Sequence, residues 1–296
     1  MKTAAQKKAQ QNRGTIFIEN GSLLKVEEFP SDQFIMRIRS PKCAAAARPG
    51  SFVHVSCDET LPMRRPLSIM RVDDDCIEIL YKIVGDGLRW LSKKRPGDSI
   101  SVLGPIGQPF QLHAERPNTL LIGGGVGIPP MVFIADYLRQ NPSNWNPIAI
   151  LGSEIPFPFA YRASTLATPW TDDAVNATMP LFEEWGIPCR LATLAGYSGC
   201  YDGYVTELAD RWLSTLSAGE LAKTEVFGCG PTPMLKAVAE LAANYDLPCQ
   251  VSLEEFMACA VGGCAGCAVK IETPNGEAMQ RVCVDGPVFD ASTVVW

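Results

Sequence analysis

Four cysteines near the end of the 296-residue chain are the residues best suited to chemistry. Cys259, Cys264 and Cys267 have the spacing C-x4-C-x2-C, and fifteen residues separate the last of them from Cys283. This order of thiolates is typical of a plant-type [2Fe-2S] cluster. Most residues between the first three are glycine or alanine, which let backbone N–H groups approach inorganic sulfides closely. The spacing therefore predicts that these four cysteines bind a [2Fe-2S] cluster.

Zinc binding and disulfide formation are the alternatives. Structural zinc sites also use four thiolates, but they usually pair two short cysteine hooks, and here Cys283 stands alone. Disulfides are less expected, because a chain of this length can bury a core without cross-links and shows no secretory signal. A zinc-stabilised binding module without redox activity therefore stays open as the non-enzymatic alternative.

The composition is that of an ordinary globular protein. Hydrophobic residues make up 47% and charged residues 20%, and the net charge of −6 offers no basic surface for nucleic acid. Eleven cysteines without an export signal favour a reducing cytoplasm. Residues 1–13 are polar and are expected to form a disordered tail. The apolar stretch 119–135 is interrupted by glycines and a proline pair, so no membrane span is predicted.

The elements that must position the cysteines begin with residues 14–115. Short apolar or alternating runs there are separated by glycine and proline, which predicts an antiparallel barrel or sandwich. The runs lie at 33–39, 51–56, 76–83 and 99–103.

Two motifs in this region suit a diphosphate. The tetrapeptide Arg65–Ser68 places a guanidinium and a hydroxyl on one strand, where we expect both to face the same ligand. Further on, a strand leads through the glycine turn Gly85–Gly87 to a helix expected from Leu88, and N–H groups behind such a turn bind anions. The alternatives are an edge strand with incidental surface arginines and an ordinary strand-to-helix turn.

Residues 116–250 alternate strands with helices, which predicts a doubly wound parallel sheet that binds ligands at the carboxyl ends of its strands. The expected strands are 119–122, 147–151, 189–193 and 225–228, and the expected helices are 131–139, 181–185, 204–213 and 233–243. Residues 154–178 follow no period and are expected to form a surface excursion without an assigned function. His54 and His113 have no ligand-spaced neighbour and are expected to be structural.

Two glycine-rich loops fall at the carboxyl ends of these strands. The first, residues 123–130, lacks the G-x-G-x-x-G spacing of the Rossmann fingerprint, but its glycines still let a dinucleotide lie against bare backbone. The second, residues 228–234, places Cys229 and Gly230 at a strand end. We expect Cys229 to contact a nicotinamide, and the alternative is a buried thiol without a role.

Taken in order, RPLS, the glycine turn, GGGVGIPPM, GCGPTPM and the cysteine tail resemble a known family. It is the electron transfer subunit of NAD-dependent (class B) dihydroorotate dehydrogenase, within the ferredoxin reductase-like superfamily. The most specific likeness lies at 252–270 and 281–289. The resemblance implies a multidomain β and α/β protein, with an FAD-binding barrel at 14–115, an NAD-binding domain at 116–250 and a small [2Fe-2S] module at 251–296.

The resemblance also implies roles for residues outside the cysteines. It places Arg65–Ser68 around the flavin, Tyr81–Ile83 along its sugar or ring, and Gly87 and Leu88 at the diphosphate. The superfamily often has Thr or Ser where this chain has Leu88, so one hydroxyl contact is expected to be missing. The predicted cofactor-binding residues are thus Arg65, Pro66, Leu67, Ser68, Tyr81, Lys82, Ile83, Gly87, Leu88, Gly123, Gly124, Gly125, Gly127, Cys229 and Gly230.

The family likewise implies a partner. In it, reducing equivalents from dihydroorotate enter FMN in a separate catalytic subunit, cross the cluster, reach FAD and leave as hydride on NAD, in pyrimidine biosynthesis. A heterotetramer with that FMN-containing subunit is expected. A flavin itself converts two-electron into one-electron chemistry, so no catalytic acid or base is predicted. NADP in place of NAD stays open, as does a NAD(P)H-linked reductase subunit of a sulfhydrogenase or of a ferredoxin-linked transhydrogenase.

Overall fold

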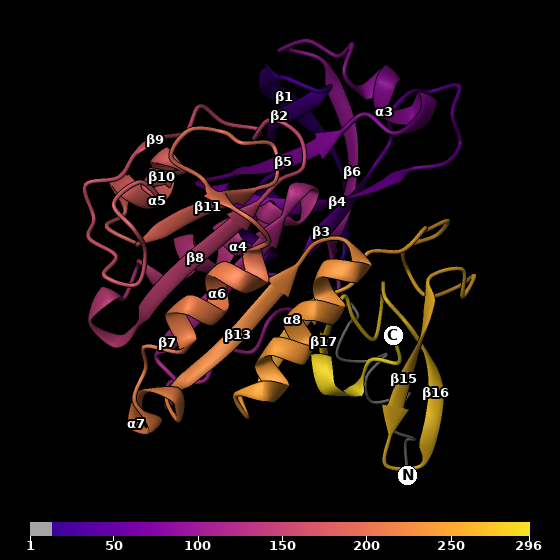
Figure 1. Ribbon diagram of the computed structural model, residues 1–296. Helices are drawn as coiled ribbons and strands as arrows, with labels where there is room; N and C mark the ends of the chain where they lie inside the picture. Colours follow the sequence, from indigo (N-terminus) through magenta and orange to yellow (C-terminus); the bar gives the residue numbers. More distant parts are fainter. Residues whose placement is uncertain (1–13) are drawn as a thin grey trace.

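The computed structural model describes residues 14–296, and its N-terminal part is a closed six-stranded barrel (Figure 1). Neighbouring strands are antiparallel, in the order β1-β2-β5-β4-β3-β6. The predicted barrel is confirmed, whereas the predicted tail at 1–13 lies outside the described residues. The elements are β1 (Phe17–Phe29), β2 (Gln33–Arg39), α2 (Pro41–Ala46), β3 (Phe52–Val55), β4 (Arg65–Asp73), β5 (Cys76–Lys82), α3 (Gly85–Leu91) and β6 (Ser99–Ile106).

Alternating side chains fill the inside of the barrel. Ile77 and Ile79 of β5 are fully buried and pack with Met36 of β2. Two positions beyond Ile79, the ring of Tyr81 stacks on Phe34 with centroids 5.5 Å apart. The side chain of Tyr81 therefore belongs to the barrel core.

A seven-stranded sheet follows the barrel, in the order β12-β11-β8-β7-β13-β14-β17. Neighbouring strands are parallel except for β14 and β17. The order reverses between β7 (Asn118–Gly124) and β13 (Thr224–Cys229), so their carboxyl ends form the switch point of the doubly wound sheet that was predicted. The other strands are β8 (Asn146–Gly152), β11 (Cys189–Thr193), β12 (Tyr201–Asp202), β14 (Cys249–Ser252) and β17 (Val288–Asp290).

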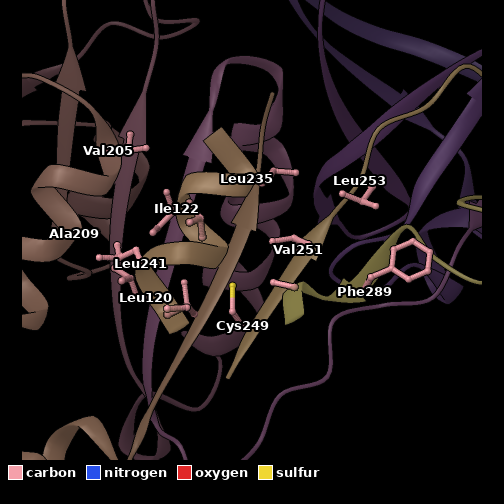
Figure 2. Packing of buried hydrophobic residues seen from close by; sticks show 14 of the residues in the cluster. Leu120, Ile122, Val205, Ala209, Leu235, Leu241, Cys249, Val251, Leu253 and Phe289 are labelled. Atoms are coloured by element: carbon pink, nitrogen blue, oxygen red, sulfur yellow. The ribbon is translucent and has the colours of Figure 1, made fainter. Parts of the chain in front are cut away.

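Helices cover both faces of the sheet (Figures 1 and 2). Leu120 and Ile122 pack toward Leu241 of α8, whereas Leu121 between them packs with Met131 of α4 on the other face. Burial on both faces explains the unbroken apolar run of this strand. Within residues 14–296, no helix is long and apolar enough to cross a bilayer. The helices of this part are α4 (Ile128–Leu138), α5 (Pro180–Glu184), α6 (Val205–Leu213), α7 (Ala218–Leu221) and α8 (Thr232–Asn244).

The segment 154–178 is more buried than predicted. Phe157, Phe159 and Ala177 are at most 9% exposed and join the core around α4. The short strands β9 (Arg162–Ala163) and β10 (Ala177–Thr178) pair with each other inside the segment. The prediction of a surface excursion is therefore wrong for its two ends, which are anchored by apolar side chains.

The cysteine segment is continuous with the sheet. The hairpin of β15 (Ala268–Thr273) and β16 (Gly276–Arg281) lies at the lower right of Figure 1, and the chain then returns through β17 to pair with β14. The predicted domain boundary between 250 and 251 falls inside β14. Because β17, which follows the cysteine segment, pairs with β14 of the sheet, the cysteine segment is held in a fixed place against the sheet.

Candidate functional site

The four predicted cluster cysteines lie in two pairs. The Sγ atoms of Cys267 and Cys283 are 3.3 Å apart, and the thiols of Cys259 and Cys264 interact with each other. A [2Fe-2S] cluster has two irons, and each takes two protein ligands, so paired thiols suit it. Among residues 14–296, no three His, Cys, Asp or Glu side chains are gathered around the position of a single metal ion.

Backbone N–H groups of the cysteine loop point at sulfur. Gly263 donates to the Sγ of Cys259 at 3.2 Å, and Gly266 donates to the Sγ of Cys264 at 3.4 Å. Burial raises the pKa of Cys259, but N–H groups such as that of Val261 outweigh it and lower the pKa to about 7. These donors favour the thiolate, which is the form that binds iron.

Arg65, at the start of β4, lies against the first turn of α3. A Cβ added at Gly87 would come within 2.8 Å of the guanidinium carbon of Arg65, so the guanidinium lies directly against the backbone of the turn. The forked cation therefore sits where the chain turns from β5 into α3, and it suits a diphosphate. α3 begins at Gly85, three residues before the predicted start, so the glycine turn is itself the first helical turn.

The neighbouring Arg64 has a different role. Its guanidinium donates to the carbonyl oxygens of His54 at 3.0 Å and Ser101 at 2.9 Å, and to the Oγ of Ser101 at 2.8 Å. These bonds join the start of β4 to β3 and β6. Arg64 thus stabilises the barrel wall, whereas Arg65 is directed to α3.

The register of β4 corrects one prediction. Phe52 and His54 of β3 pair with Ser68 and Pro66 in an unbroken ladder. Residues three apart on a regular strand point to opposite sides, so Arg65 and Ser68 do not face the same side. The prediction that both face one ligand from the same side is wrong, and the two can meet only different parts of an extended molecule.

Three predicted flavin residues point their side chains into the barrel core. They are Leu67, Tyr81 and Leu88, each at most 8% exposed. Burial raises the pKa of Tyr81, whose hydroxyl lies 3.8 Å from the sulfur of Met36. Only backbone atoms of these three residues are left for a ligand, while Lys82 and Ile83 stay partly exposed.

The two glycine loops meet at the switch point of the sheet. Gly123 at the end of β7 pairs with Cys229 at the end of β13. A Cβ added at Gly127 would overlap the carbonyl group of Cys229, and one added at Gly124 would overlap the sulfur of Met234. Glycine at both positions therefore lets the loops touch. Sequence reasoning missed Met234, and its place in GCGPTPM was the only signal.

Cys229 itself is fully buried. Burial and the charge of Glu254 raise its pKa well above the usual value, so the thiol is protonated near pH 7. Its enclosure in the core around α4 agrees with the alternative interpretation, in which Cys229 is a buried thiol without a role. A nicotinamide contact by Cys229 stays a prediction.

The cysteine segment contacts the end of the barrel just after β6, where Gln108 donates to the carbonyl oxygens of Val284 at 3.0 Å and of Gly286 at 2.6 Å. Phe52 of β3 and Ile106 of β6 share one apolar core with Ala260, Cys267 and Cys283. The predicted cluster site therefore adjoins the strand that pairs with RPLS.

Comparisons with known proteins bear on this geometry. Residues 254–295 match the family model described as the iron-sulfur cluster binding domain of dihydroorotate dehydrogenase B. The electron transfer subunit of dihydroorotate dehydrogenase B (NAD(+)) from Desulforamulus reducens is 32% identical over 94% of this chain and 98% of its own length. The chain belongs to this family of electron transfer subunits.

Other members and more distant structures agree with the assignment. The electron transfer subunit from Caldanaerobacter subterraneus is 31% identical over 84% of this chain and 87% of its own length. The structure of an NADH-dependent reduced ferredoxin-NADP oxidoreductase matches with a TM-score of 0.75 and 28% identity, over 94% and 90% of the two chains. A ferredoxin reductase of carbazole 1,9a-dioxygenase, with a TM-score of 0.59 and 20% identity over 79% and 67%, shows the fold alone.

Family membership confirms several predictions at once. The chain is an electron transfer subunit of an oxidoreductase with the ferredoxin reductase-like fold, and it acts with a separate catalytic subunit. The predicted set of FAD, a [2Fe-2S] cluster and NAD is confirmed at the level of the family. The family match is to an iron-sulfur module, and so it favours iron over the zinc alternative.

Proposed function

We propose that this subunit carries electrons between an FMN-containing catalytic subunit that oxidises dihydroorotate and NAD, in a cytoplasmic heterotetramer. The observation that carries the proposal is the contact between the segment that follows Cys283 and the end of the barrel, made by hydrogen bonds from Gln108 to the carbonyl oxygens of Val284 and Gly286. Electrons that arrive at paired thiolates there would be close to a flavin bound along RPLS. The names of the relatives supply dihydroorotate and NAD as the substrates.

The proposal assigns a cofactor to each part of the chain. The barrel at 14–115 binds FAD, the α/β part at 116–250 binds NAD, and the segment 251–296 holds the cluster. Arg65 neutralises the diphosphate, backbone atoms of β4, β5 and α3 contact the flavin, and the two touching glycine loops expose backbone to the nicotinamide nucleotide. When bound, FAD supplies the conversion between hydride and single-electron chemistry.

A second candidate rests on the high structural similarity to the NADH-dependent reduced ferredoxin-NADP oxidoreductase. In that case the chain would serve a ferredoxin-linked reductase with the same cofactors and another partner. Purification of the complex from its source discriminates between the two. A co-purifying FMN protein that oxidises dihydroorotate supports the first candidate, and reduction of the chain by ferredoxin without such a partner supports the second.

The cofactor assignment predicts the spectrum of the oxygen-free protein. We expect flavin bands together with broad visible absorption from thiolate-to-iron charge transfer, and the broad absorption should disappear in Cys264→Ser while the flavin bands stay. Metal analysis of the same samples should find iron and no stoichiometric zinc. A colourless protein that contains zinc would contradict the proposal.

The two neighbouring arginines provide a matched test of the flavin site. Arg65→Gln should weaken FAD binding by about 1.5–3 kcal/mol, or roughly ten- to a hundredfold, because charged hydrogen bonds to the diphosphate are lost. Arg64→Gln should instead lower the free energy of unfolding of the apoprotein, by about 1–3 kcal/mol, since the charged hydrogen bonds that join Arg64 to His54 and Ser101 are lost. FAD titration and urea denaturation measure the two effects. Equal loss of FAD affinity in both variants would contradict the assignment of Arg65.

A further inference from the structure

His54 occupies the middle of β3, in the barrel wall next to RPLS. It is 1% exposed and pairs with Pro66 on β4 and with Leu103 on β6. Its two neighbours in the strand, Val53 and Val55, point into the barrel core. Strand alternation therefore directs the imidazole outward, away from the barrel core.

The outward side of β3 is the side that the cysteine loop covers. Phe52, which shares this side with His54, packs in the same core as Met257 and Cys267. The backbone carbonyls of Arg64 and Met257 both face the ring of His54. The imidazole of His54 thus lies between the wall of the barrel and the loop that carries Cys259.

The ring is an unsatisfied polar group in this packed junction. Both ring nitrogens are buried without a hydrogen-bond partner among residues 14–296. A buried donor or acceptor left unpaired costs about 1–3 kcal/mol, so an imidazole here calls for an explanation other than packing. Burial, together with the charges of Arg64 and Arg65, lowers the pKa of His54 to about 4, and near pH 7 the ring is neutral with one N–H donor.

We propose that His54 is a positioning residue for the cluster loop, whose ring N–H donates to the backbone carbonyl of Met257 when the loop closes around the cluster. Met257 comes two residues before Cys259 in the chain. The bond would tie the start of the loop to the barrel wall and so fix the cluster next to the strand pair that carries RPLS. The inference rests on the proposed function, because it requires this loop to hold the cluster.

Two substitutions separate a hydrogen-bond role from a packing role. His54→Leu keeps much of the volume and removes the donor, whereas His54→Gln keeps an N–H donor. The variants are prepared without oxygen with their cofactors, and the rate of iron loss to a chelator is recorded. We expect iron loss from His54→Leu to be about ten- to a hundredfold faster than from the wild type, the usual effect of losing an outer partner of a metal site. His54→Gln should stay close to the wild type.

The other histidine provides the control. His113 bonds to the carboxylate of Glu225 at 2.9 Å, and His113→Leu should leave the rate of iron loss unchanged. If His54 only fills space, the order reverses, because leucine suits a buried apolar site better than glutamine. Wild-type iron retention in His54→Leu, or equally fast loss in His54→Gln, would overturn the proposal.

Variants that take up no cluster are also informative. A folded His54→Leu apoprotein without iron, beside a His54→Gln protein with full iron content, supports the proposal, and a folded His54→Gln apoprotein without iron overturns it. Iron and flavin content of the wild type, measured in parallel, test the proposed function separately. Wild-type protein without iron would refute that function, whereas loaded wild type with an unaffected His54→Leu would refute only the role of His54.

Discussion

Replacing Gly127 with alanine is expected to slow the reduction of bound FAD by NADH about a hundredfold. The added Cβ would overlap the carbonyl group of Cys229, so one of the two glycine loops must move. A displacement of about 1 Å at a reacting centre is enough for a loss of this size, even when the displaced group does no chemistry. Stopped-flow absorption of the flavin, with excess NADH, measures the rate directly.

Gly219 offers the matched control for this experiment. It lies in α7, and no atom comes within 4 Å of a Cβ added there. Gly219→Ala should therefore reduce its flavin at the wild-type rate. Dithionite reduction counts the bound FAD in each sample, so that loss of cofactor is not mistaken for slow hydride transfer. A wild-type rate in Gly127→Ala would show that the two loops do not form the nicotinamide site.

Replacing Cys267 with serine is expected to stop electron transfer between dihydroorotate, oxidised on the catalytic subunit, and the FAD of this subunit. The variant should lose the cluster, because Cys267 is paired at 3.3 Å with Cys283 and a pair of thiolates is needed for one iron. NAD reduction by dihydroorotate in the reconstituted complex should fall by about a hundredfold or more. Reduction of FAD by NADH in the isolated subunit should continue, since it does not pass through the cluster.

The control for that variant is Cys200→Ser. Cys200 is a partly buried free cysteine outside the quartet, and its removal should leave iron content and electron transfer unchanged. Iron analysis, visible absorption and dihydroorotate-dependent NADH formation are measured on both proteins. Full iron content in Cys267→Ser, or loss of iron in Cys200→Ser, would contradict the ligand assignment.

The sequence was most informative where the chemistry is local. The spacing of Cys259, Cys264 and Cys267 is a property of one short loop, and the loop alone brings Gly263 and Gly266 to the sulfurs. The apolar run of β7 similarly predicted a strand buried on both faces. The fold class could therefore be predicted before any three-dimensional information, and the assignment of the four cysteines as cluster ligands stays a prediction.

Contacts between distant segments could not be predicted in this way. The approach of Arg65 to Gly87 depends on how the barrel closes, and neither residue signals the other along the chain. Tyr81 lies in β5, where apolar residues occupy both sides of the strand, so the pattern did not show that its ring faces the core rather than a ligand. The position predicted for the domain boundary falls inside β14, and the pairing of β14 with β17, nearly forty residues later in sequence, could not be foreseen.

His54 illustrates the same limit at a single residue. From sequence it was a lone histidine, and a structural role was the reasonable expectation. Only the pairing of β3 with β4, together with the packing of Met257 from the cysteine loop, places an unpaired imidazole at the junction. The hypothesis about His54 therefore comes from contacts between distant segments and not from the local sequence pattern.

The central claim is that the cluster and the flavin of this subunit belong to one electron path. The most direct measurement reduces the loaded subunit with dithionite, mixes it with excess NAD without oxygen, and follows the cluster by freeze-quench electron paramagnetic resonance. We predict that the signal of the reduced [2Fe-2S] cluster decays as NADH forms. NADH formation while the cluster signal persists undiminished would contradict the account.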